Sequence, residues 1–447
     1  MDLNEVVIVS TARTALAKSF RGSFNDTEAP VLGGHVVRAV VERAGIDPAD
    51  VEDVIMGAAV QQGTQAYNIG RLCAYTGGLP ESVPGMALDR MCASGLMSIG
   101  VAAKNILSGE MSIAIGGGVE SLSLTQTKHK NSYRAQSEAV LQAMPSAYIP
   151  MIETAEIVSR RYGISRAAQD EYALQSQLRT AAAQRDGLFD DEIVSLSVDK
   201  LLFAGDGQAN GHERVQVSRD ECNRPSTRLE DLAALKPVWK DGKWIGQGEY
   251  VTAGNASQFS DGASASLLMS RAEARRRGLT PLGIFRGIAV GGCAPEEMGI
   301  GPVIAIPKLL KRFGLSVADI GLWEINEAFA CQVLHCRDAL HIPAERLNVN
   351  GGAISIGHPF GMSGARMVGH ALLEGRRRGV RYVVIAMCIG GAWGLRACSS
   401  CPSPCCFNSN HAGLTVGPAA GEWLCNLVCP MHKSWRTWAW SWPITNR

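Results

Sequence analysis

The feature of this sequence that most constrains its fold is an internal repeat. Residues 45–57 pass from a glycine through a short acidic turn into an apolar run, and residues 314–326 repeat that pattern with Gly, Ala and Asp in register. Further on, each half carries an apolar helical pattern, a glycine-containing stop and a strand that ends in glycines, with the strands at residues 111–118 and 382–391. Self-similarity on this scale predicts that one half of the chain is a copy of the other.

The alternation of strand and helix patterns with short glycine turns predicts an α/β protein. We expect a duplicated fold, in which two similar α/β halves with mixed sheets carry an inserted cap (loop) domain. The N-terminal half would take residues 1–121 plus 253–279, and the C-terminal half residues 280–394. Residues 122–252 are more polar than either half and would form the cap over a site.

Periodicity places several individual elements. Apolar spacing predicts a strand at residues 5–10, a helix at residues 30–44 and a long amphipathic helix at about residues 154–186. Residues 263–270 are expected as the strand that completes the N-terminal half. The strand at residues 111–115 is expected to lie in a sheet whose edge would otherwise be open, which favours assembly of subunits.

Charge and hydropathy limit which classes of partner and which cellular location we expect. A formal net charge of +1 gives no reason to expect nucleic acid or an anionic membrane as a general partner. The first five residues are acidic and lead directly into a strand, so no signal peptide is predicted. No apolar run approaches the length of a membrane span. We therefore expect a soluble cytoplasmic protein with no membrane partner.

Cys92 is the first candidate for chemistry. It lies where an irregular segment gives way to the apolar, glycine-containing helical pattern of residues 94–103. The sulfur would then face the positive end of a helix dipole, which lowers the pKa of a thiol and favours the nucleophilic thiolate. The alternative is a small buried apolar residue at a tight turn.

Three further segments combine reactive side chains with tight or glycine-rich backbone. They are residues 326–329, which begin with Asn326, residues 351–359, which contain His358, and residues 387–391, which contain Cys388. Each has an ordinary structural alternative, namely a helix start, a capping histidine and a plain strand residue.

Together these four segments resemble the thiolase family, the enzymes that make or cleave 3-ketoacyl-CoA, and the resemblance runs from residue 3 to about residue 391. It implies that Cys92 accepts the acyl group and that Cys388 acts as acid and base. His358 and Asn326 match the two remaining catalytic positions. The resemblance also implies a homodimer or a homotetramer.

The resemblance further implies a set of substrate contacts. Ser257 would lie in the loop that contacts pantetheine, and Arg224 would lie near the nucleotide of CoA. The residues expected to line the acyl pocket are Met151, Met298 and Phe329. Residues 148–153 lack the histidine that some biosynthetic members carry before the methionine, so the sequence leaves the preferred acyl chain length open.

The chemistry of a 3-ketoacyl thioester requires these residue types. Making or breaking its carbon–carbon bond needs an acyl carrier that is a good leaving group, hence a thiolate, and a base for an α-proton. Two oxyanions also form. We expect the N–H groups of Cys92 and Gly390 to stabilise one, and the His358 ring with a water held by Asn326 to stabilise the other. No metal or redox cofactor is expected, because coenzyme A thioesters are the substrates.

Two other functions stay open at this point. One is a decarboxylating ketoacyl synthase, which release of carbon dioxide from a malonyl thioester would identify. The other is a non-catalytic or impaired CoA- or lipid-binding protein, which would bind CoA without exchanging acyl groups.

The C-terminal segment departs from the pattern of the repeat. The second half should continue with a strand at residues 392–402. Polar side chains there would point to both faces of such a strand, and prolines occur at 402 and 404. Residues 395–447 are rich in Cys, Trp, Ser and Pro without helical or strand period, as in a coding sequence read in a shifted frame. We expect an unstructured tail in place of the last core strand, and therefore low activity and low soluble yield.

A zinc module is the alternative for this tail. Cysteines and a histidine occur there at ligand-like spacing, namely Cys398, Cys401, Cys425, Cys429 and His432.

Overall fold

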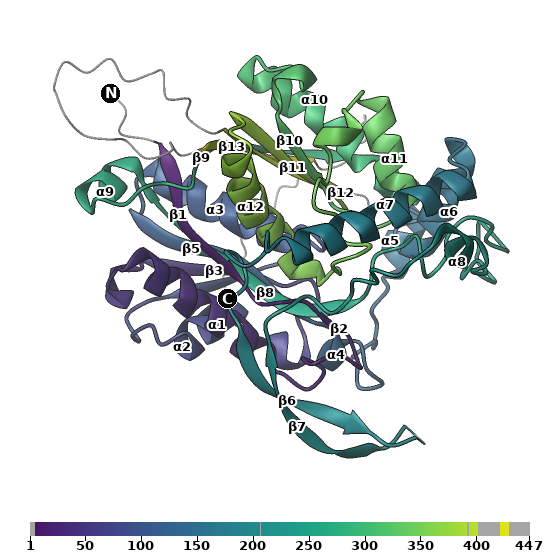
Figure 1. The fold of residues 1–447 in the computed structure, drawn as a ribbon, viewed down its shortest axis with the longest axis horizontal. Helices are drawn as coiled ribbons and strands as arrows, with labels where there is room; N and C mark the ends of the chain where they lie inside the picture. Colours follow the sequence, from purple (N-terminus) through teal and green to yellow (C-terminus); the bar gives the residue numbers. More distant parts are fainter. Residues whose placement is uncertain (1–4, 206, 391–392, 401–420, 429–447) are drawn as a thin grey trace, which may run out of the picture.

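The computed structural model describes residues 5–205, 207–390, 393–400 and 421–428 of the chain (Figure 1). The N-terminal half begins with a strand and alternates helices and strands, as predicted. Its elements are β1 (Val6–Arg13), β2 (Ala17–Lys18), α1 (Ala29–Ala44), β3 (Asp53–Gly57), α2 (Ile69–Thr76), β4 (Gly85–Leu88), α3 (Ser94–Ser108), β5 (Ile113–Ser121) and β8 (Ser260–Ser270).

The C-terminal half repeats this alternation. Helix α9 (Arg271–Arg276) closes the N-terminal half. The elements of the second half are β9 (Gly283–Gly292), the 3-10 helix η3 (Pro295–Ile300), α10 (Gly301–Phe313), β10 (Leu322–Ile325), α11 (Ala330–Ala339), α12 (Phe360–Arg377), β11 (Tyr382–Ile389), β12 (Trp393–Ser400) and β13 (Gly421–Val428). The repeat is confirmed at the level of strand pairing. Asp53 of β3 pairs in parallel with Ala114 of β5, and Leu322 of β10 pairs in parallel with Val383 of β11.

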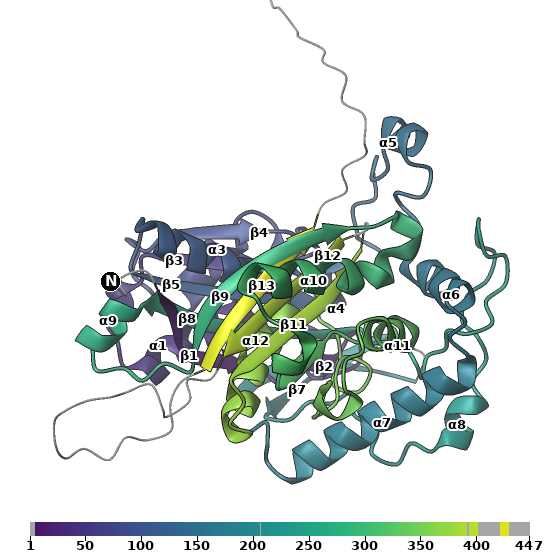
Figure 2. The ribbon, with the colours of Figure 1, turned by 90° about the horizontal axis from the view of Figure 1, so that it is seen from above.

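The two halves share one 11-stranded sheet in the described part of the chain, in the order β10-β11-β12-β13-β9-β1-β8-β5-β3-β4, with β2 beside β8. A short antiparallel pairing of β1 with β9, from Val6 opposite Phe285 to Ile8 opposite Gly283, joins the halves. Figure 2 shows β9, β13, β12 and β11 side by side. Residues 111–115 lead into β5, which lies inside this sheet between β3 and β8, and the open edges among the described strands are β4 and β10.

Helices α3 and α12 pack together in the middle of the molecule. Apolar side chains of both, such as Ile99 and Val368, share one core with Leu268 of β8 and Ile385 of β11. Helix α1 covers the outer face of the N-terminal sheet, and α10 and α11 cover the outer face of β10 and β11. This central pairing brings the start of α3 next to the start of α12.

Glycines allow the starts of the two helices to meet. A Cβ added at Gly95, in the first turn of α3, would lie 2.5 Å from the carbonyl oxygen of Gly361 in the first turn of α12. A Cβ at Gly118 of β5 would lie 2.0 Å from the same oxygen. Heavy atoms cannot approach so closely, so only glycine fits at these crossings.

Helix α3 also has the composition of a membrane span. Residues Met91–Ser108 have a mean hydropathy of 1.2, and 61% of this window is buried inside the protein. The expectation that no apolar run approaches the length of a span is therefore wrong at this place. Because α3 packs between strands of the sheet and α12, its apolar character is explained by the core.

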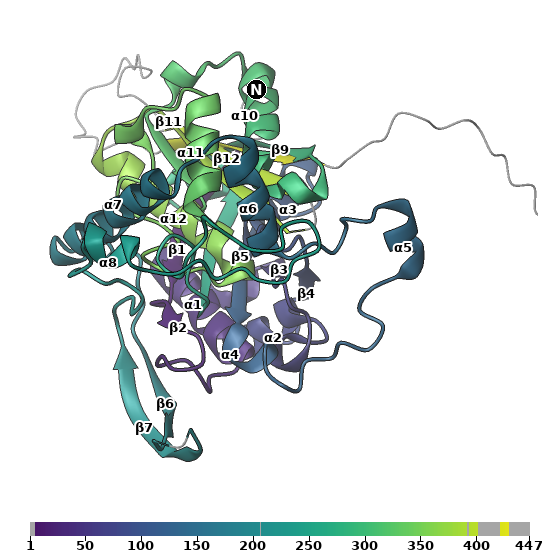
Figure 3. The same cartoon turned by 90° about the vertical axis from the view of Figure 1, so that its right-hand side faces the viewer.

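The inserted segment supplies α4 (Leu122–Thr125), α5 (Glu138–Ala143), α6 (Met151–Arg161), α7 (Arg166–Arg185), β6 (Leu196–Phe203), β7 (Ala209–Val217) and α8 (Leu229–Ala233). The single helix expected at residues 154–186 is wrong, because α6 and α7 are separated at Gly163, whose φ of +65° ends the first helix. The β6–β7 hairpin and the segment around α5 project from the body of the molecule (Figure 3).

The structure corrects the expectation for the C-terminal segment. Strand β12 (Trp393–Ser400) pairs antiparallel with β11, from Ile389 opposite Trp393 to Ile385 opposite Ala397, and also with β9. The prolines at 402 and 404 follow the end of this strand and do not interrupt its ladder. Residues 421–428 form a second strand, β13, which pairs with β9 and β11 too. The rest of the expected tail lies outside the described residues.

Candidate active site

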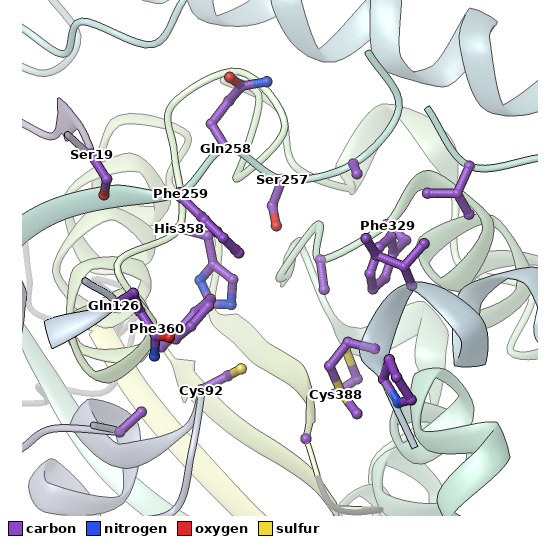
Figure 4. A pocket seen from close by; sticks show the side chains of 18 of the residues that line it. Ser19, Cys92, Gln126, Ser257, Gln258, Phe259, Phe329, His358, Phe360 and Cys388 are labelled. Carbon is purple, nitrogen blue, oxygen red and sulfur yellow. The ribbon is translucent and has the colours of Figure 1, made fainter. Parts of the chain in front are cut away.

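A cavity of about 780 Å³ opens between the halves beneath the cap. Cys92, His358, Cys388 and Gly390 line it together, which confirms that the repeat brings their loops to one place (Figure 4). Most other lining residues are apolar, and they come from the cap, from loops of the N-terminal half that include residues 18–20, 59–60 and 253–259, from η3 and from the two residues before α11. The cavity therefore presents a few reactive groups within an apolar wall.

A tight turn presents Cys92 just before α3. The turn includes Met91, whose φ of +50° is left-handed, and its N–H donates to Asp89 Oδ1 at 2.6 Å. The Ser94 hydroxyl oxygen accepts from the N–H of Arg90 at 2.8 Å. These local hydrogen bonds hold the thiol at the N-terminal end of the helix, as the sequence predicts.

The resting charge of Cys92 differs from the expectation. Burial raises the pKa of Cys92 to about 12; the N–H groups of Gly390 and of Cys92 itself lower it, while the carboxylates of Glu120 and Asp89 raise it. The predicted lowering of the pKa is therefore wrong, and the resting group is a thiol. The two N–H groups that contact the sulfur are the pair expected to form an oxyanion hole.

His358 is buried and neutral. Burial lowers the pKa of His358 to about 3, with a smaller effect from the positive charge of Arg366. Its Nδ1 lies 2.6 Å from the hydroxyl oxygen of Ser363, and that hydroxyl donates to the carbonyl of Pro359 at 2.9 Å. Because the Ser363 hydrogen is committed to Pro359, Nδ1 must donate to Ser363, and the lone pair lies on Nε2.

Asn326 supports that arrangement. It follows β10, and its backbone N–H donates to the carbonyl of Ala386 at 2.8 Å. Its Nδ2 lies 3.3 Å from Nε2 of His358 and donates to it, because Nε2 carries the lone pair. Asn326 is not among the residues that line the cavity, and it contacts the lining residue His358.

Cys388 lies near the end of β11 and is 1% exposed. Burial raises the pKa of Cys388 well above its ordinary value, and the next cause is the charge of an ionised Cys92. Cys388 and Cys92 lie on the wall of the same cavity (Figure 4). Both cysteines are thiols in the resting site.

The expected substrate contacts divide between two hollows. Met151, Met298, Phe329 and Ser257 all line the main cavity. Arg224 lines a smaller hollow of about 360 Å³, which shares Ala253 and Gln258 with the main cavity. The hollow beside Arg224 therefore adjoins the main cavity.

Sequence reasoning missed three buried residues that support the site. Ser363 fixes the tautomer of His358, and Glu120 contacts the start of α12 through the N–H of Gly361 at 2.7 Å. Glu327, next to Asn326, accepts from the hydroxyl of Tyr172 at 2.8 Å and from the hydroxyl of Ser176 at 2.7 Å. The adjacency of Glu327 to Asn326 was the only signal available in the sequence.

The candidate zinc ligands of the C-terminal segment cannot be placed. The side chains of Cys398, Cys401, Cys425, Cys429 and His432 lie outside the described residues.

The fold and the site define an acyl-transferring α/β enzyme with two cysteines in one cavity. A family profile described as "Thiolase, N-terminal domain" matches residues 6–272, and one described as "Thiolase, C-terminal domain" matches residues 279–399. The chain belongs to the thiolase family.

Relatives of known name agree with this assignment. The chain is 43% identical over 399 residues to 3-ketoacyl-CoA thiolase 5, peroxisomal, of Arabidopsis thaliana, across 88% of this chain and 85% of the relative. It is 41% identical over 393 residues to 3-ketoacyl-CoA thiolase of Bacillus subtilis, across 88% and 98%. These relatives favour thiolase-type acyl transfer over the synthase and the binding protein considered above.

Solved structures give the same result. Human mitochondrial 3-ketoacyl-CoA thiolase superposes with a TM-score of 0.76 at 35% identity, covering 89% of this chain and 98% of the other. The acetyl-CoA acetyltransferase of Bacillus anthracis superposes with a TM-score of 0.77 at 35% identity, covering 88% and 98%. The duplicated α/β fold is thus that of thiolases.

Proposed function

We propose that this protein transfers acyl groups between coenzyme A thioesters through Cys92. In one direction it cleaves a 3-ketoacyl-CoA with free CoA, and in the other it condenses two acetyl-CoA to acetoacetyl-CoA. The observation that carries this proposal is the presence of Cys92, His358 and Cys388 on the wall of one apolar cavity.

The first step is the activation of Cys92. With a pKa of about 12, the thiol does not ionise alone at neutral pH. The unprotonated Nε2 of His358 takes its proton, which forms a thiolate and an imidazolium without changing the net charge of the cavity. In cleavage, the thiolate attacks the keto carbon, and the bond between that carbon and the α-carbon breaks.

Cys388 acts on the α-carbon. In cleavage, the electron pair of the broken bond forms the enolate of acetyl-CoA, and Cys388 donates a proton to its carbon. Free CoA then gives its thiol proton to the Cys388 thiolate and attacks the acyl-cysteine, and Cys92 leaves as the thiolate, which takes its proton back from the imidazolium of His358. In condensation the same steps run backwards, so Cys388 removes the α-proton. Neither direction transfers electrons to a carrier, so we propose no metal or redox cofactor.

Two sets of donors stabilise the developing oxyanions. The N–H groups of Cys92 and Gly390 point at the sulfur of Cys92 and would serve the tetrahedral acyl intermediate. The imidazolium Nε2–H of His358 would serve the enolate. Asn326 Oδ1 is buried and has no partner among the described residues, so it can hold a water beside that oxygen.

Coenzyme A would follow the path of the two hollows. A solved structure of human mitochondrial 3-ketoacyl-CoA thiolase in complex with CoA matches this chain with a TM-score of 0.77. We place the pantetheine arm beside Ser257 and the nucleotide beside Arg224. The apolar wall formed by Met151, Met298 and Phe329 would hold the acyl chain. Comparison of acetoacetyl-CoA with longer 3-ketoacyl-CoA substrates measures the preferred length.

We also propose a homodimer or homotetramer in the cytoplasm. The assembly is supported by the edge strand β4, whose residues Gly85–Leu88 are only half-buried and whose outer backbone groups have no partner strand among the described residues. Light scattering that gives a monomer would contradict the assembly. Fractionation of cells, with antibody detection of the full chain, tests the location.

Labelling with radioactive acetyl-CoA tests the reaction. Cys92→Ser should abolish covalent labelling, because the acyl-accepting sulfur is lost. Cys388→Ser should keep the label on Cys92 but stop condensation, because the enolate cannot form. Covalent labelling of the Cys92→Ser variant would contradict the proposal. Release of carbon dioxide from malonyl-CoA would favour the decarboxylating ketoacyl synthase instead.

A further inference from the structure

Glu120 is a buried carboxylate that no step above uses. It lies near the end of β5 and is 0% exposed. Its four hydrogen-bond partners are all donors: the N–H groups of Ala59 at 2.9 Å, Val60 at 3.2 Å and Gly361 at 2.7 Å, and Nε2 of Gln65 at 2.5 Å. Burial raises the pKa of Glu120, but none of these partners could accept a carboxyl proton, so the site satisfies only the ionised form.

The contacts of Glu120 cross from one half of the molecule to the other. Ala59 and Val60 belong to the loop after β3 and line the cavity. Gly361 belongs to the first turn of α12, three residues after His358. A Cβ at Gly361 would lie 2.7 Å from Cα of Ala58 and 2.9 Å from Oε2 of Glu120, so this contact is close-packed. Glu120 therefore holds the start of α12, which follows His358, against the N-terminal half, which carries Cys92.

The charge of Glu120 also affects the pKa of Cys92. Among the charges that act on this thiol, the carboxylate of Glu120 on β5 has a larger effect than Asp89 in the turn of Cys92 itself. The other titratable groups around the cavity are Lys18 of β2, Cys388 of β11 and His358 before α12. A fixed negative charge on this side opposes ionisation of Cys92.

We propose that Glu120 is a positioning residue for acyl transfer. It holds the His358 loop where Nε2 can take the proton of Cys92. This inference rests on the proposed function, because it assigns Cys92 as the nucleophile.

Two variants separate position from charge. Glu120→Asp keeps the charge but is one methylene too short to reach all four donors. We expect kcat for acetoacetyl-CoA cleavage to fall by about tenfold or more while KM stays within about threefold, because geometry and not binding is lost. Glu120→Gln removes the charge and sets an NH2 group against N–H donors. It should lower kcat similarly and shift the pH midpoint of Cys92 alkylation downwards by about one unit.

The alkylation is measured with iodoacetamide and peptide mass spectrometry, which reports Cys92 separately from the other cysteines. Glu153→Gln is the matched control. Glu153 is a buried carboxylate on α6 that accepts from the N–H groups of Trp244 at 2.6 Å and Ile245 at 2.8 Å, away from Cys92. It should lower the melting temperature and leave both kcat and the alkylation midpoint unchanged.

Several outcomes would overturn the role of Glu120. A folded Glu120→Gln with the wild-type midpoint overturns the charge effect, and a folded Glu120→Asp with wild-type kcat overturns the positioning effect. If neither variant folds while Glu153→Gln does, Glu120 is a determinant of folding and the proposal is wrong. The alkylation midpoint is measured without any acyl transfer, so it tests Glu120 even if acetyl-CoA fails to label wild-type Cys92 and the proposed function is rejected.

Discussion

At the scale of single residues, burial decides the charges in the cavity. A charge at a helix end gains about 0.3–1 kcal/mol from the helix dipole, less than one pKa unit. Full burial can shift a pKa by about 3–5 units. For Cys92 the larger effect prevails, so the thiol stays protonated at the start of α3. The neutral imidazole of His358, with its tautomer fixed by Ser363, is what makes this thiol useful.

The buried His358 makes stability depend on pH. Its pKa is about 3 in the folded state and 6.5 for an unperturbed histidine, so below pH 6.5 only the unfolded chain takes up the proton. Stability must therefore fall as the pH falls from 6.5 towards 3. Between pH 7.5 and pH 5, we expect the free energy of unfolding to fall by about 2 kcal/mol less for His358→Gln than for the wild type.

Urea denaturation at fixed protein concentration measures this difference. Comparing the two proteins cancels the contributions of other titratable groups to the pH dependence of stability. One such group is Asp261: burial raises its pKa to about 6, and its contribution to stability has the opposite sign to that of His358. Equal losses for the variant and the wild type would show that His358 is not held neutral.

At the scale of elements, the site depends on how closely two helices approach. Cys92 precedes α3 and His358 precedes α12, so the two side chains meet only because the first turns of these helices touch. Gly95 and Gly118 leave no side chain between those turns and the carbonyl of Gly361. The glycines that end the β5 pattern therefore serve packing at the site as well as strand formation.

Gly118→Ala should separate the two helix starts. Its Cβ would lie 2.0 Å from the carbonyl oxygen of Gly361, so the backbone must shift. We expect a loss of about 1–3 kcal/mol in the free energy of unfolding and a lower kcat for acetoacetyl-CoA cleavage. Gly246→Ala is the control, because a Cβ there meets no atom within 4 Å. Chemical denaturation and steady-state kinetics check both variants, and wild-type values for Gly118→Ala would contradict this account of the packing.

At the scale of the whole molecule, the second half is completed by a strand that the sequence pattern does not predict. Strand β12 pairs with β11 and β9, and β13 pairs with the same two strands. A strand has two hydrogen-bonding edges, yet β12 pairs with three strands, β11, β13 and β9, so β12 and β13 share one place between β11 and β9. The sheet therefore needs one strand at this position, and residues 393–400 can supply it.

A pair of truncations tests this. A chain that ends at Ser400 keeps β12, so we expect it to stay soluble, to melt within a few degrees of the full chain and to keep acyl-transfer activity. A chain that ends at Gly390 leaves β9 and β11 without that partner. Unpaired buried backbone groups cost about 1–3 kcal/mol each, so this chain should be insoluble.

Solubility, thermal melting and acetoacetyl-CoA cleavage are measured for both truncations. If the chain that ends at Ser400 is insoluble while the full chain is soluble, then residues beyond 400 are needed, and β13 supplies the strand instead.

Local sequence determined the duplication, the α/β class and the chemical identity of the reactive residues. Strand and helix patterns are set by periods of two and 3.6 residues, which can be recognised within short windows. The helix at residues 30–44, the strand at residues 263–270 and the loops of Cys92 and His358 are of this kind, and the structure confirms them. The break between α6 and α7 could also be predicted from the sequence, because Gly163 marks it.

Tertiary structure alone decided what those residues can do. The ionisation of Cys92 and His358 depends on burial by parts of the chain far away in sequence, and so do the four donors around Glu120. Strand β12 depends on the edges that β11 and β9 offer, since backbone pairing is possible for a segment whose side chains show no strand period. Desolvation and strand pairing are properties of the assembled surroundings, so no short stretch of sequence contains them.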